Sequence, residues 1–284
     1  MELSGWVALS LTEHLGSKTL RALLDHFNGD MDAVFAEDSA ALRRVPGIGP
    51  KIAASIQAVD RAQVAQAITR WQAEGVSIVP VFAAAYPPRL KTLTDAPATL
   101  YLRGHLPSQA ARHIAIVGTR TPTPRAAHLA LHISRELAQQ GVVIVSGLAR
   151  GVDADAHLGA LQAKNGRTLA VLGCGVLRVY PPENQVMAGL IQHEGALISE
   201  VAPNAAPSTP RLVARNRLIS GLSDAVLIVE SSAEGGAMYA ARRALEQGRP
   251  VYTLDLPASG NQALIAGGAQ ALRPDLRAVK ALLS

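Results

Sequence analysis

The sequence predicts an α/β protein with an extended Rossmann-like, doubly wound, mostly parallel sheet and a small all-α domain at its N-terminus. From His113 onward, short runs of Val, Ile and Leu alternate with amphipathic segments of helical period. Strands that are apolar on both faces and joined by helices are typical of a parallel sheet covered on both sides. Residues 1–72, by contrast, show short helical periodicities broken by Gly and Pro and almost no strand-like run.

The chain divides by pattern into three regions, and its 284 residues suit one large domain plus a small one. Residues 1–75 are expected to form a helical domain of the helix-hairpin-helix, SAM-like type. Residues 76–112 are Pro-punctuated and irregular, and we interpret them as the lead-in segment of the Rossmann-like domain. Residues 113–284 are expected to form the Rossmann-like domain itself.

The elements of the third region follow in order. Ile114–Val117 is the first strand, and a helix over about Arg125–Gln140 is closed by Gly141, in the position of a helix C-cap. The next elements are a strand at Val142–Val145, a helix at Asp153–Ala163, and strands at Thr168–Leu172, Ala196–Ser199, Ala225–Val229 and Pro250–Leu254. Parallel sheets of this kind bind ligands beyond the carboxyl ends of their strands.

Composition narrows the class of protein. The chain carries a net charge of +5 with 22 Arg and 5 Lys, and Arg grips phosphate oxygens in pairs, which suits a polyanionic partner. Codon usage in a GC-rich genome explains the same excess equally well. No run of about 20 apolar residues spans a bilayer and no leader is visible, so we expect a cytoplasmic protein without membrane contact. The single cysteine, Cys174, excludes an intramolecular disulfide.

Turns bearing Gly or Ser follow the predicted strands and should cluster on one edge of the sheet. They are Gly118-Thr119-Arg120, Ser146-Gly147-Leu148-Ala149-Arg150-Gly151, Gly173-Cys174-Gly175 and Glu230-Ser231-Ser232-Ala233-Glu234-Gly235-Gly236. Glycine lets the backbone approach a ligand closely, and helix N-termini offer N–H groups to a phosphate. Arg120 and Arg150 would add guanidinium groups beside the bound anion. Alternatively, these glycines merely cap and bend the chain.

A basic run precedes the strand at Ala225. It contains Arg211, Arg215, Asn216 and Arg217, and whether extended or helical it places phosphate-capable donors at the rim of the sheet. The alternative is a solvated basic face.

The familiar cofactor and catalytic patterns are missing or weak. No G-x-G-x-x-G follows the first strand and no P-loop lysine is present, so NAD and ATP lack their usual sequence support. No cofactor is expected, and no metal either, because the chain has one cysteine and no third ligand is indicated beside Asp153 and His157. Asp153 and His157 share a helical face and could act in acid–base catalysis, but we favour Asp153 as a helix N-cap and His157 as a packed neighbour. Cys174 is interpreted as a small apolar residue.

The N-terminal region holds a hairpin signature at Val45-Pro46-Gly47-Ile48-Gly49-Pro50-Lys51-Ile52-Ala53. In such a turn, backbone N–H groups point at a DNA phosphate while the flanking apolar residues pack two helices together. Gly47, Gly49 and Lys51 are therefore candidate DNA contacts. A hairpin that only packs is the alternative.

Taken together, these motifs resemble the DNA-processing-protein-A (DprA/Smf) family over residues 76–270. Beyond the turns above, the resemblance includes Val152-Asp153-Ala154-Asp155-Ala156-His157, Tyr180-Pro181-Pro182-Glu183-Asn184, Ile198-Ser199-Glu200, Arg215-Asn216-Arg217-Leu218-Ile219-Ser220-Gly221 and Leu100-Tyr101-Leu102-Arg103-Gly104.

The resemblance implies a non-enzymatic protein whose Rossmann-like domain binds single-stranded DNA without strong sequence preference. Family members dimerise and help load a RecA-type recombinase onto DNA covered by single-strand-binding protein, in natural transformation and recombination. Arg120, Asn216 and Arg217 are implied as phosphate or nucleotide contacts, and Arg150 stands where the family often has Lys. The full expected DNA-binding set is Gly118, Thr119, Arg120, Ser146, Gly147, Arg150, Gly151, Gly173, Gly175, Asn216 and Arg217.

The chain departs from the family at three places. Val213-Ala214 replaces a Phe that commonly precedes the Arg-Asn-Arg run, so an aromatic that could stack on a base is missing there. Gly236-Ala237-Met238-Tyr239 and Leu256-Pro257 also differ from the usual segments. The winged-helix domain that many relatives append is expected to be absent.

Two other classes of protein remain open. A phosphoribohydrolase-like enzyme on a related Rossmann fold would use the same anion-binding turns, although no Pro-Gly-Gly-x-Gly-Thr turn is present and only Glu230 and Glu234 are acidic near the corresponding strand end. A protein-binding adaptor would leave the rim arginines without a role.

Overall fold

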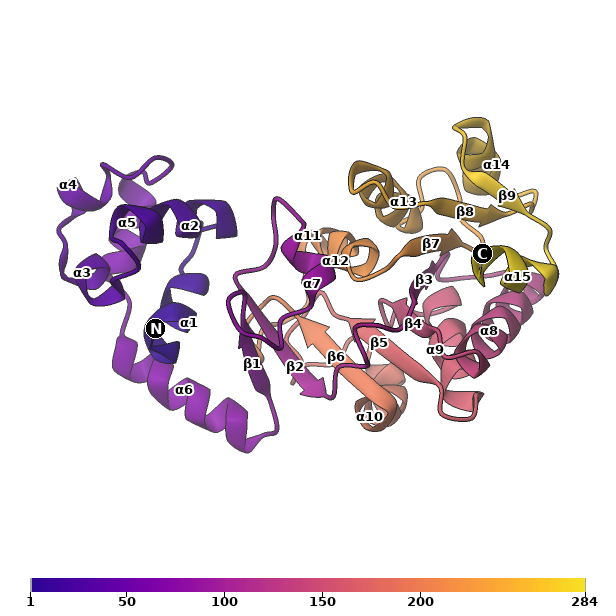
Figure 1. The fold of residues 1–284 in the computed structure, drawn as a ribbon, viewed down its shortest axis with the longest axis horizontal. Coiled ribbons are helices and arrows are strands. Elements are labelled where there is room, and N and C mark those ends of the chain that lie inside the picture. The colour runs from indigo at the N-terminus through magenta and orange to yellow at the C-terminus, as the bar shows by residue number, and fades with distance from the viewer. Residues whose placement is uncertain (1, 284) are drawn as a thin grey trace.

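The computed structural model describes residues 2–283, which form a helical N-terminal region beside a large α/β region (Figure 1). The described residues before Ser77 contain no strand. The helices of this region are α1 (Leu3–Ser10), α2 (Ser17–His26), α3 (Met31–Ala36), α4 (Ser39–Leu42), α5 (Pro50–Gln57) and α6 (Arg61–Ala73).

Side-chain caps fix where several of these short helices begin. The carboxylates of Asp30, Asp38 and Asp60 accept hydrogen bonds from the backbone N–H three residues on, at 3.0, 2.8 and 2.9 Å. Each cap satisfies one backbone donor that the first helical turn leaves unpaired. Trp6 and Leu23 are buried in the apolar cluster that holds these helices together.

The α/β region is built on one nine-stranded sheet with the order β1-β2-β6-β5-β4-β3-β7-β8-β9. The strands are β1 (Ser77–Pro80), β2 (Thr99–Gly104), β3 (His113–Val117), β4 (Val143–Ser146), β5 (Arg167–Val171), β6 (Gly195–Ser199), β7 (Ala225–Ile228), β8 (Val251–Leu254) and β9 (Gln270–Leu272). Strands β3 to β9 pair in parallel, while β1 and β2 are antiparallel and extend one edge. The predicted doubly wound, mostly parallel architecture is confirmed.

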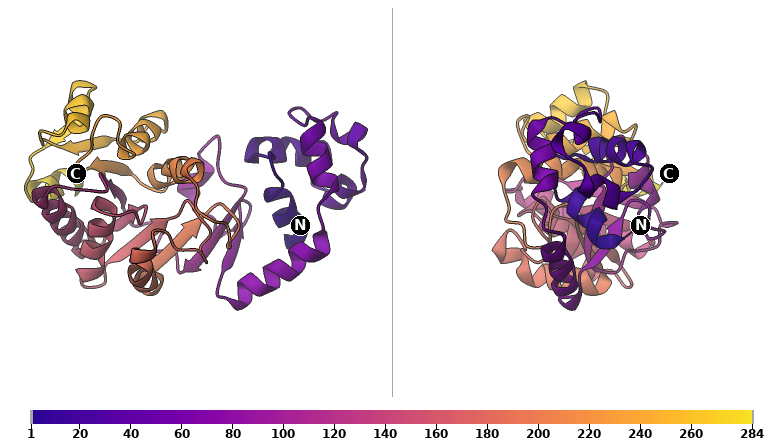
Figure 2. Two further views of the ribbon diagram at one scale, coloured as in Figure 1. Left: turned by 180° about the vertical axis from the view of Figure 1, so that it is seen from behind. Right: turned by 90° about the vertical axis from the view of Figure 1, so that its left-hand side faces the viewer.

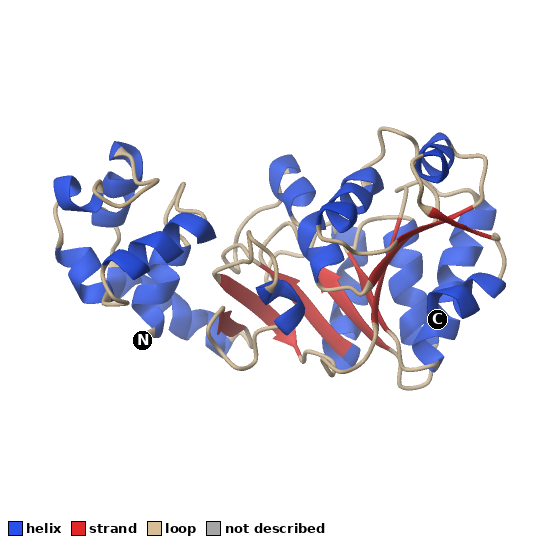
Figure 3. Cartoon of the chain, turned by 45° about the horizontal axis from the view of Figure 1, so that its top comes forward, coloured by secondary structure: helices blue, strands red, loops and turns tan. Residues whose placement is uncertain are grey.

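Helices cover both faces of this sheet (Figure 3). Along β3, Ile114 and Ile116 face one apolar cluster, whereas Ala115 and Val117 face the other, as the two-residue period of a strand requires. The first cluster lies under α8 (Pro124–Gln139), α9 (Val152–Gln162) and α15 (Arg277–Leu283); the second lies under α7 (Pro88–Lys91), α12 (Asn216–Gly221), α13 (Ala237–Glu246) and α14 (Ser259–Ala266). The remaining helices are η1 (Pro182–Asn184), α10 (Gln185–Glu194) and α11 (Thr209–Ala214).

The observed boundaries lie within one or two residues of those predicted. Helix α8 ends in a Schellman motif: Gly141 has a φ of +80°, its N–H donates to Ala138 O at 3.0 Å, and the N–H of Val142 donates to Leu137 O at 3.2 Å. The predicted C-cap glycine is therefore confirmed. Asp153 is not the N-cap of α9, because that position belongs to Gly151 and Asp153 lies inside the helix.

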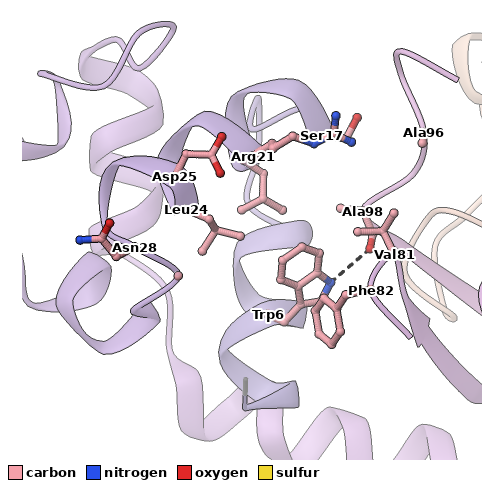
Figure 4. A pocket seen from close by; sticks show the side chains of 12 residues that line it. Trp6, Ser17, Arg21, Leu24, Asp25, Asn28, Val81, Phe82, Ala96 and Ala98 are labelled. Carbon is pink, nitrogen blue, oxygen red and sulfur yellow. Dashed lines mark hydrogen bonds between the residues drawn. The ribbon is translucent and has the colours of Figure 1, made fainter. Parts of the chain in front are cut away.

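The segment predicted to be irregular, residues 76–112, contains β1, α7 and β2 and carries the helical region on the edge of the sheet (Figure 2). The indole N–H of Trp6 donates to Thr99 Oγ1 at 2.8 Å and to Ala98 O at 3.2 Å. Beside this contact, a pocket of about 470 Å³ opens between α2 and the chain from Val81 to Ala98 (Figure 4).

Between residues 2 and 283, no helix is both long and apolar enough to cross a bilayer. The same residues include no cluster of three or more His, Cys, Asp or Glu side chains that could hold a metal ion.

Candidate nucleic-acid interface

The connectivity of the sheet creates a switch point between β3 and its neighbours. From β3 the chain proceeds to β4, β5 and β6 on one side, and β7 and β8 lie on the other side. In such sheets, ligands bind where the order reverses, beyond the carboxyl ends of the strands. A pocket of about 470 Å³, here called the switch pocket, lies at this point.

The switch pocket is lined by the turns that follow three strands. Gly118, Thr119 and Arg120 follow β3, Ala149 follows β4, and Gly235 and Gly236 follow β7. A smaller pocket of about 40 Å³, here called the side pocket, adjoins it and is lined by Gly147, Arg150, Tyr180 and Leu212, together with Arg120. The predicted clustering of the turns after β3, β4 and β7 on one edge is thus seen in the structure.

A buried guanidinium, that of Arg215, forms the floor of both pockets. Its Nη1 donates to the carbonyl oxygens of Gly147 and Val171, and its Nε donates to Asn216 Oδ1 at 3.2 Å. One side chain therefore connects the ends of β4 and β5 to the junction between α11 and α12. Arg stays protonated inside proteins, so this position is a fixed positive charge.

Asp153 is the partner of this buried cation. Its Oδ2 lies 3.9 Å from Arg215 Nη2 and accepts hydrogen bonds from the N–H groups of Gly147 at 3.1 Å and Ala149 at 3.4 Å. Burial raises the pKa of the Asp153 carboxyl, whereas Arg215 and the two N–H donors lower it. The pair therefore holds the turn after β4 in place from inside the protein. Other groups are left to contact a ligand at the opening of the pocket.

Two glycines of this turn permit its close packing. A Cβ on Gly147 would collide with the guanidinium of Arg215. Gly151 has a φ of +69°, a conformation that residues with side chains rarely adopt, and a Cβ there would lie 2.5 Å from Thr119 O. Both glycines are needed for the packing of the site, independently of any ligand.

The accessible cations at the pockets are Arg120 and Arg150. Arg120 is exposed and makes no hydrogen bond or ion pair with any residue between 2 and 283. Arg150 is also exposed and pairs with Glu183 at the start of η1. The backbone N–H groups of these two arginines have no partner within the described chain. An anion entering the pockets would therefore meet two exposed guanidinium groups.

Several turn N–H groups expected to face a phosphate are already used inside the protein. The N–H of Thr119 donates to Glu230 O at 2.7 Å, that of Gly175 donates to Ala205 O at 2.9 Å, and that of Gly147 donates to Asp153. These three N–H groups are therefore not available to an anion.

Three other predicted contacts line neither pocket, and a fourth, Asn216, lines the switch pocket with its side chain already engaged. Ser146 is buried and donates to Ile116 O at 2.7 Å. Gly173 packs against the backbone of Leu212, and Gly175 packs against that of Pro203. Asn216 lines the switch pocket, but its side chain is engaged with Arg215 and with Gly236 O at 3.4 Å.

Arg217 is separated from Arg120 in the structure. It pairs with Glu200 and, at 3.4 Å, with Asp95, and its side chain is only 14% exposed. It lines neither of the two pockets. Burial raises the pKa of Glu200 and Arg217 counters that shift, which indicates an ion pair between the end of β6 and α12.

The candidate catalytic side chains His157 and Cys174 are buried and hydrogen-bonded inside the protein. His157 is buried, its pKa is lowered to about 3 by burial and by Arg215, and its Nδ1 lies 2.7 Å from Thr168 Oγ1. Since Thr168 donates its own proton to Ile144 O, His157 Nδ1 carries the hydrogen of their shared bond. Cys174 is buried, its Sγ donates to Arg178 O, and burial raises the pKa of its thiol. The packed interpretations of His157 and Cys174 are confirmed.

Glu230, which follows β7, is also engaged in hydrogen bonds. Both oxygens of Glu230 accept hydrogen bonds from Thr123, from its N–H at 2.7 Å and from its Oγ1 at 3.0 Å, and so fix the start of α8. Glu234 is exposed. Glu230 therefore acts as a hydrogen-bond partner of the N-cap residue of α8.

The N-terminal hairpin is present as a turn between α4 and α5. Gly47 has a φ of +88°, Gly49 is the N-cap of α5, and the N–H of Ile48 donates to Val45 O at 3.1 Å. Lys51 is exposed in the first turn of α5. The hairpin offers a helix N-terminus and a lysine to solvent, apart from the residues of the two pockets.

Two residues of the site were not singled out from the sequence. Arg215 stood in the basic run with no signal for its burial, since packing alone selects which arginine turns inward. Tyr180 stood in a family motif with no assigned role, yet its half-exposed ring lines both pockets.

Comparison with known proteins links this geometry to one family. Residues 77–282 match the family model described as DNA recombination-mediator protein A. The DNA processing protein DprA of Bacillus subtilis is 36% identical over 211 residues, which cover 72% of this chain and 71% of the relative. For protein Smf of Synechocystis, the match covers 63% of that protein's length.

Solved structures give the same result for the fold. The DprA of Streptococcus pneumoniae superposes with a TM-score of 0.82 at 25% identity, covering 99% of this chain and 98% of that one. A DprA from Helicobacter pylori, whose structure is described in terms of a single-stranded DNA binding mode, gives a TM-score of 0.66 at 31% identity, covering 73% of this chain and 95% of that one.

Proposed function

Because this chain belongs to the DNA recombination-mediator protein A (DprA/Smf) family, we propose that it binds single-stranded DNA along the switch-point edge of its sheet. We further propose that it loads a RecA-type recombinase onto that DNA during natural transformation and recombination. The observation that carries the DNA-binding proposal is the exposed guanidinium of Arg120 at the switch pocket, which has no partner among residues 2–283. A phosphate there would gain a charge-assisted, bidentate partner without breaking an existing ion pair.

The electrostatics of the edge favour a polyanion. Asp153 balances the charge of the buried Arg215 and Glu183 pairs with Arg150, so Arg120 supplies the positive charge at the pockets that has no acidic partner among residues 2–283. The N-terminal end of α13, which begins at Ala237, adds the positive end of a helix dipole to the same pocket. The likeness to the Helicobacter pylori DprA, described as binding single-stranded DNA, supports the same ligand for this chain.

The remaining expected contacts enter as parts of this proposal. Arg120, Arg150 and the free N–H groups are proposed to hold phosphates, while Gly147, Gly151 and Asn216 shape the cavity. We propose that Gly47, Gly49 and Lys51 form a second, separate contact with DNA. The proposed domain boundaries remain 1–75, 76–112 and 113–284, and the proposed working form is a homodimer in the cytoplasm.

The direct test is fluorescence anisotropy of a labelled poly-dT oligonucleotide with the wild type and Arg120→Ala, over a series of salt concentrations. Removing one phosphate-binding cation should reduce the slope of log K against log salt by about 0.7 for a single strand. We expect Arg120→Ala to bind more weakly and to show about that decrease in slope. Arg167→Ala is the matched control. Arg167 is also an exposed arginine, but it begins β5 and so lies at the amino ends of the strands, away from the proposed site.

Equal binding by Arg120→Ala and the wild type would refute the position of the DNA site. Release of free base from nucleoside monophosphates in the same preparations would instead favour the phosphoribohydrolase-like alternative. The mediator role has its own test: the wild type should accelerate recombinase assembly on DNA coated by single-strand-binding protein, and a protein that binds DNA but gives no acceleration would contradict that role.

A further inference from the structure

Tyr180 is the one aromatic residue among the described residues that line the switch and side pockets. The residue is exposed at 38%, and the other residues that line the two pockets are aliphatic, small, polar or charged, Asp153 and the arginines among them. It borders both pockets and therefore lies between the two groups of residues that define them. The proposed phosphate contacts leave this ring without a role.

The loop that carries Tyr180 is anchored on several sides. Within it, the Sγ of Cys174 donates to Arg178 O at 2.8 Å and the N–H of Leu177 donates to Pro203 O at 2.9 Å. Beyond it, Asn184 Nδ2 donates to Leu148 O at 2.9 Å, which ties η1 to the turn after β4. A ring held by an anchored loop loses little conformational entropy when a ligand packs on it.

The surroundings of the ring suit a nucleotide more than a bare anion. Arg120 and Arg150 line the side pocket together with Tyr180, and Leu212 provides an aliphatic wall to both pockets. Val213, exposed at 37%, adds a second apolar side chain to the switch pocket. Single-stranded nucleic acid presents phosphates and unstacked bases in alternation, and proteins bind it with cations and aromatic faces together.

We propose that Tyr180 is a stacking platform for one base of the bound strand, while Arg120 and Arg150 hold the neighbouring phosphates. This proposal rests on the proposed function and specifies how that site treats the bases. The platform takes any base, because every base has a π-face, so it adds affinity without sequence preference. Tyr180 would supply the aromatic face that the chain lacks at Val213-Ala214.

The test compares two proteins, each with two ligands. Wild type and Tyr180→Leu are titrated with a labelled poly-dT oligonucleotide and with an oligonucleotide of equal length whose residues are abasic, so that phosphates are kept and bases removed. Tyr180→Leu should bind poly-dT more weakly by on the order of 5- to 150-fold, the usual range for one base–aromatic contact. The two proteins should bind the abasic oligonucleotide equally, and their salt slopes should match.

Two further variants separate a ring effect from a structural one. Tyr180→Phe keeps the ring and should bind poly-dT within about twofold of the wild type. Phe82→Leu removes another exposed aromatic ring, beside Trp6 and outside both pockets, and should leave binding unchanged. Circular dichroism melts establish that each variant is folded.

Equal weakening by Tyr180→Leu on both oligonucleotides, unchanged binding to poly-dT, or an equal weakening by Tyr180→Phe would each overturn the platform while leaving the DNA site in place. Absence of salt-dependent binding by the wild type would overturn the proposed function and the platform with it.

Discussion

Replacing Arg215 with Met removes the buried cation under the pockets while keeping a side chain of similar length. The carbonyl oxygens of Gly147 and Val171 then lose their donor, and Asp153 remains buried with only two N–H partners. Breaking one side of a buried ion pair costs about 3–5 kcal/mol because the other charge stays uncompensated. We therefore expect the free energy of unfolding to fall by about that amount.

The assay is urea unfolding followed by far-ultraviolet circular dichroism, combined with hydrogen exchange of the amides of Gly147 and Ala149. Both amides donate to Asp153 and should exchange faster in the variant, because the turn after β4 loses its attachment to Arg215. The double variant Arg215→Met, Asp153→Asn should be destabilised less than the two single variants together, by about 1–3 kcal/mol of coupling.

Arg167→Met serves as the control, since Arg167 and its partner Glu194 are both nearly half exposed and such pairs contribute about 0–1 kcal/mol. A stability of Arg215→Met within about 1 kcal/mol of the wild type would refute the reasoning, and so would full additivity in the double variant.

The buried histidine, the ion pair of Arg150 and the N-terminal hairpin each lead to a further prediction. Burial lowers the pKa of His157 from 6.5 to about 3. Between pH 7 and pH 5 this histidine therefore becomes protonated in the unfolded chain but stays neutral in the folded one, and the free energy of unfolding should fall by about 2 kcal/mol. Urea unfolding at several pH values should show this slope in the wild type and lose it in His157→Asn; an unchanged slope would contradict the assignment. Glu183→Gln frees Arg150 from its ion pair and should raise affinity for poly-dT about two- to fivefold at low salt, an effect that must vanish when Arg150 is also replaced by Ala. Lys51→Ala should weaken binding of duplex DNA about threefold and leave poly-dT binding unchanged; an equal effect on both ligands, or on neither, would argue against a separate hairpin contact.

The sheet could be predicted from sequence because each of its central strands is apolar on both faces and ends in a small-residue turn. The edge strands β1 and β2 escaped prediction because prolines at 80, 87, 88 and 97 interrupt that segment. β1 is the edge strand and ends at Pro80, where a proline is tolerated. β1 pairs with β2 and β2 pairs with β6, and no local pattern reveals either pairing.

The sequence predicted which turns form the site, but not the direction in which their side chains point. Arg215 and Arg217 are two residues apart at the start of a helix, and positions so spaced point about 200° apart. One therefore turns under the switch pocket and the other toward Glu200. Asp153 was expected to cap its own helix, but its carboxylate instead reaches the N–H groups of the preceding turn. Both outcomes depend on the packing of elements that are distant in sequence.

The internal use of the N–H groups of Thr119, Gly147 and Gly175 has a consequence for how a strand would move on this protein. A rigid nest of backbone donors fixes a phosphate at one position, whereas guanidinium groups on long side chains follow a phosphate over several ångströms. Phosphate contacts made through Arg120 and Arg150 therefore tolerate small shifts of the strand, and exchange of the base on Tyr180 would be the step between neighbouring registers. We expect a bound strand to diffuse one nucleotide at a time along the edge without dissociating, as charge-dominated contacts with nucleic acid allow.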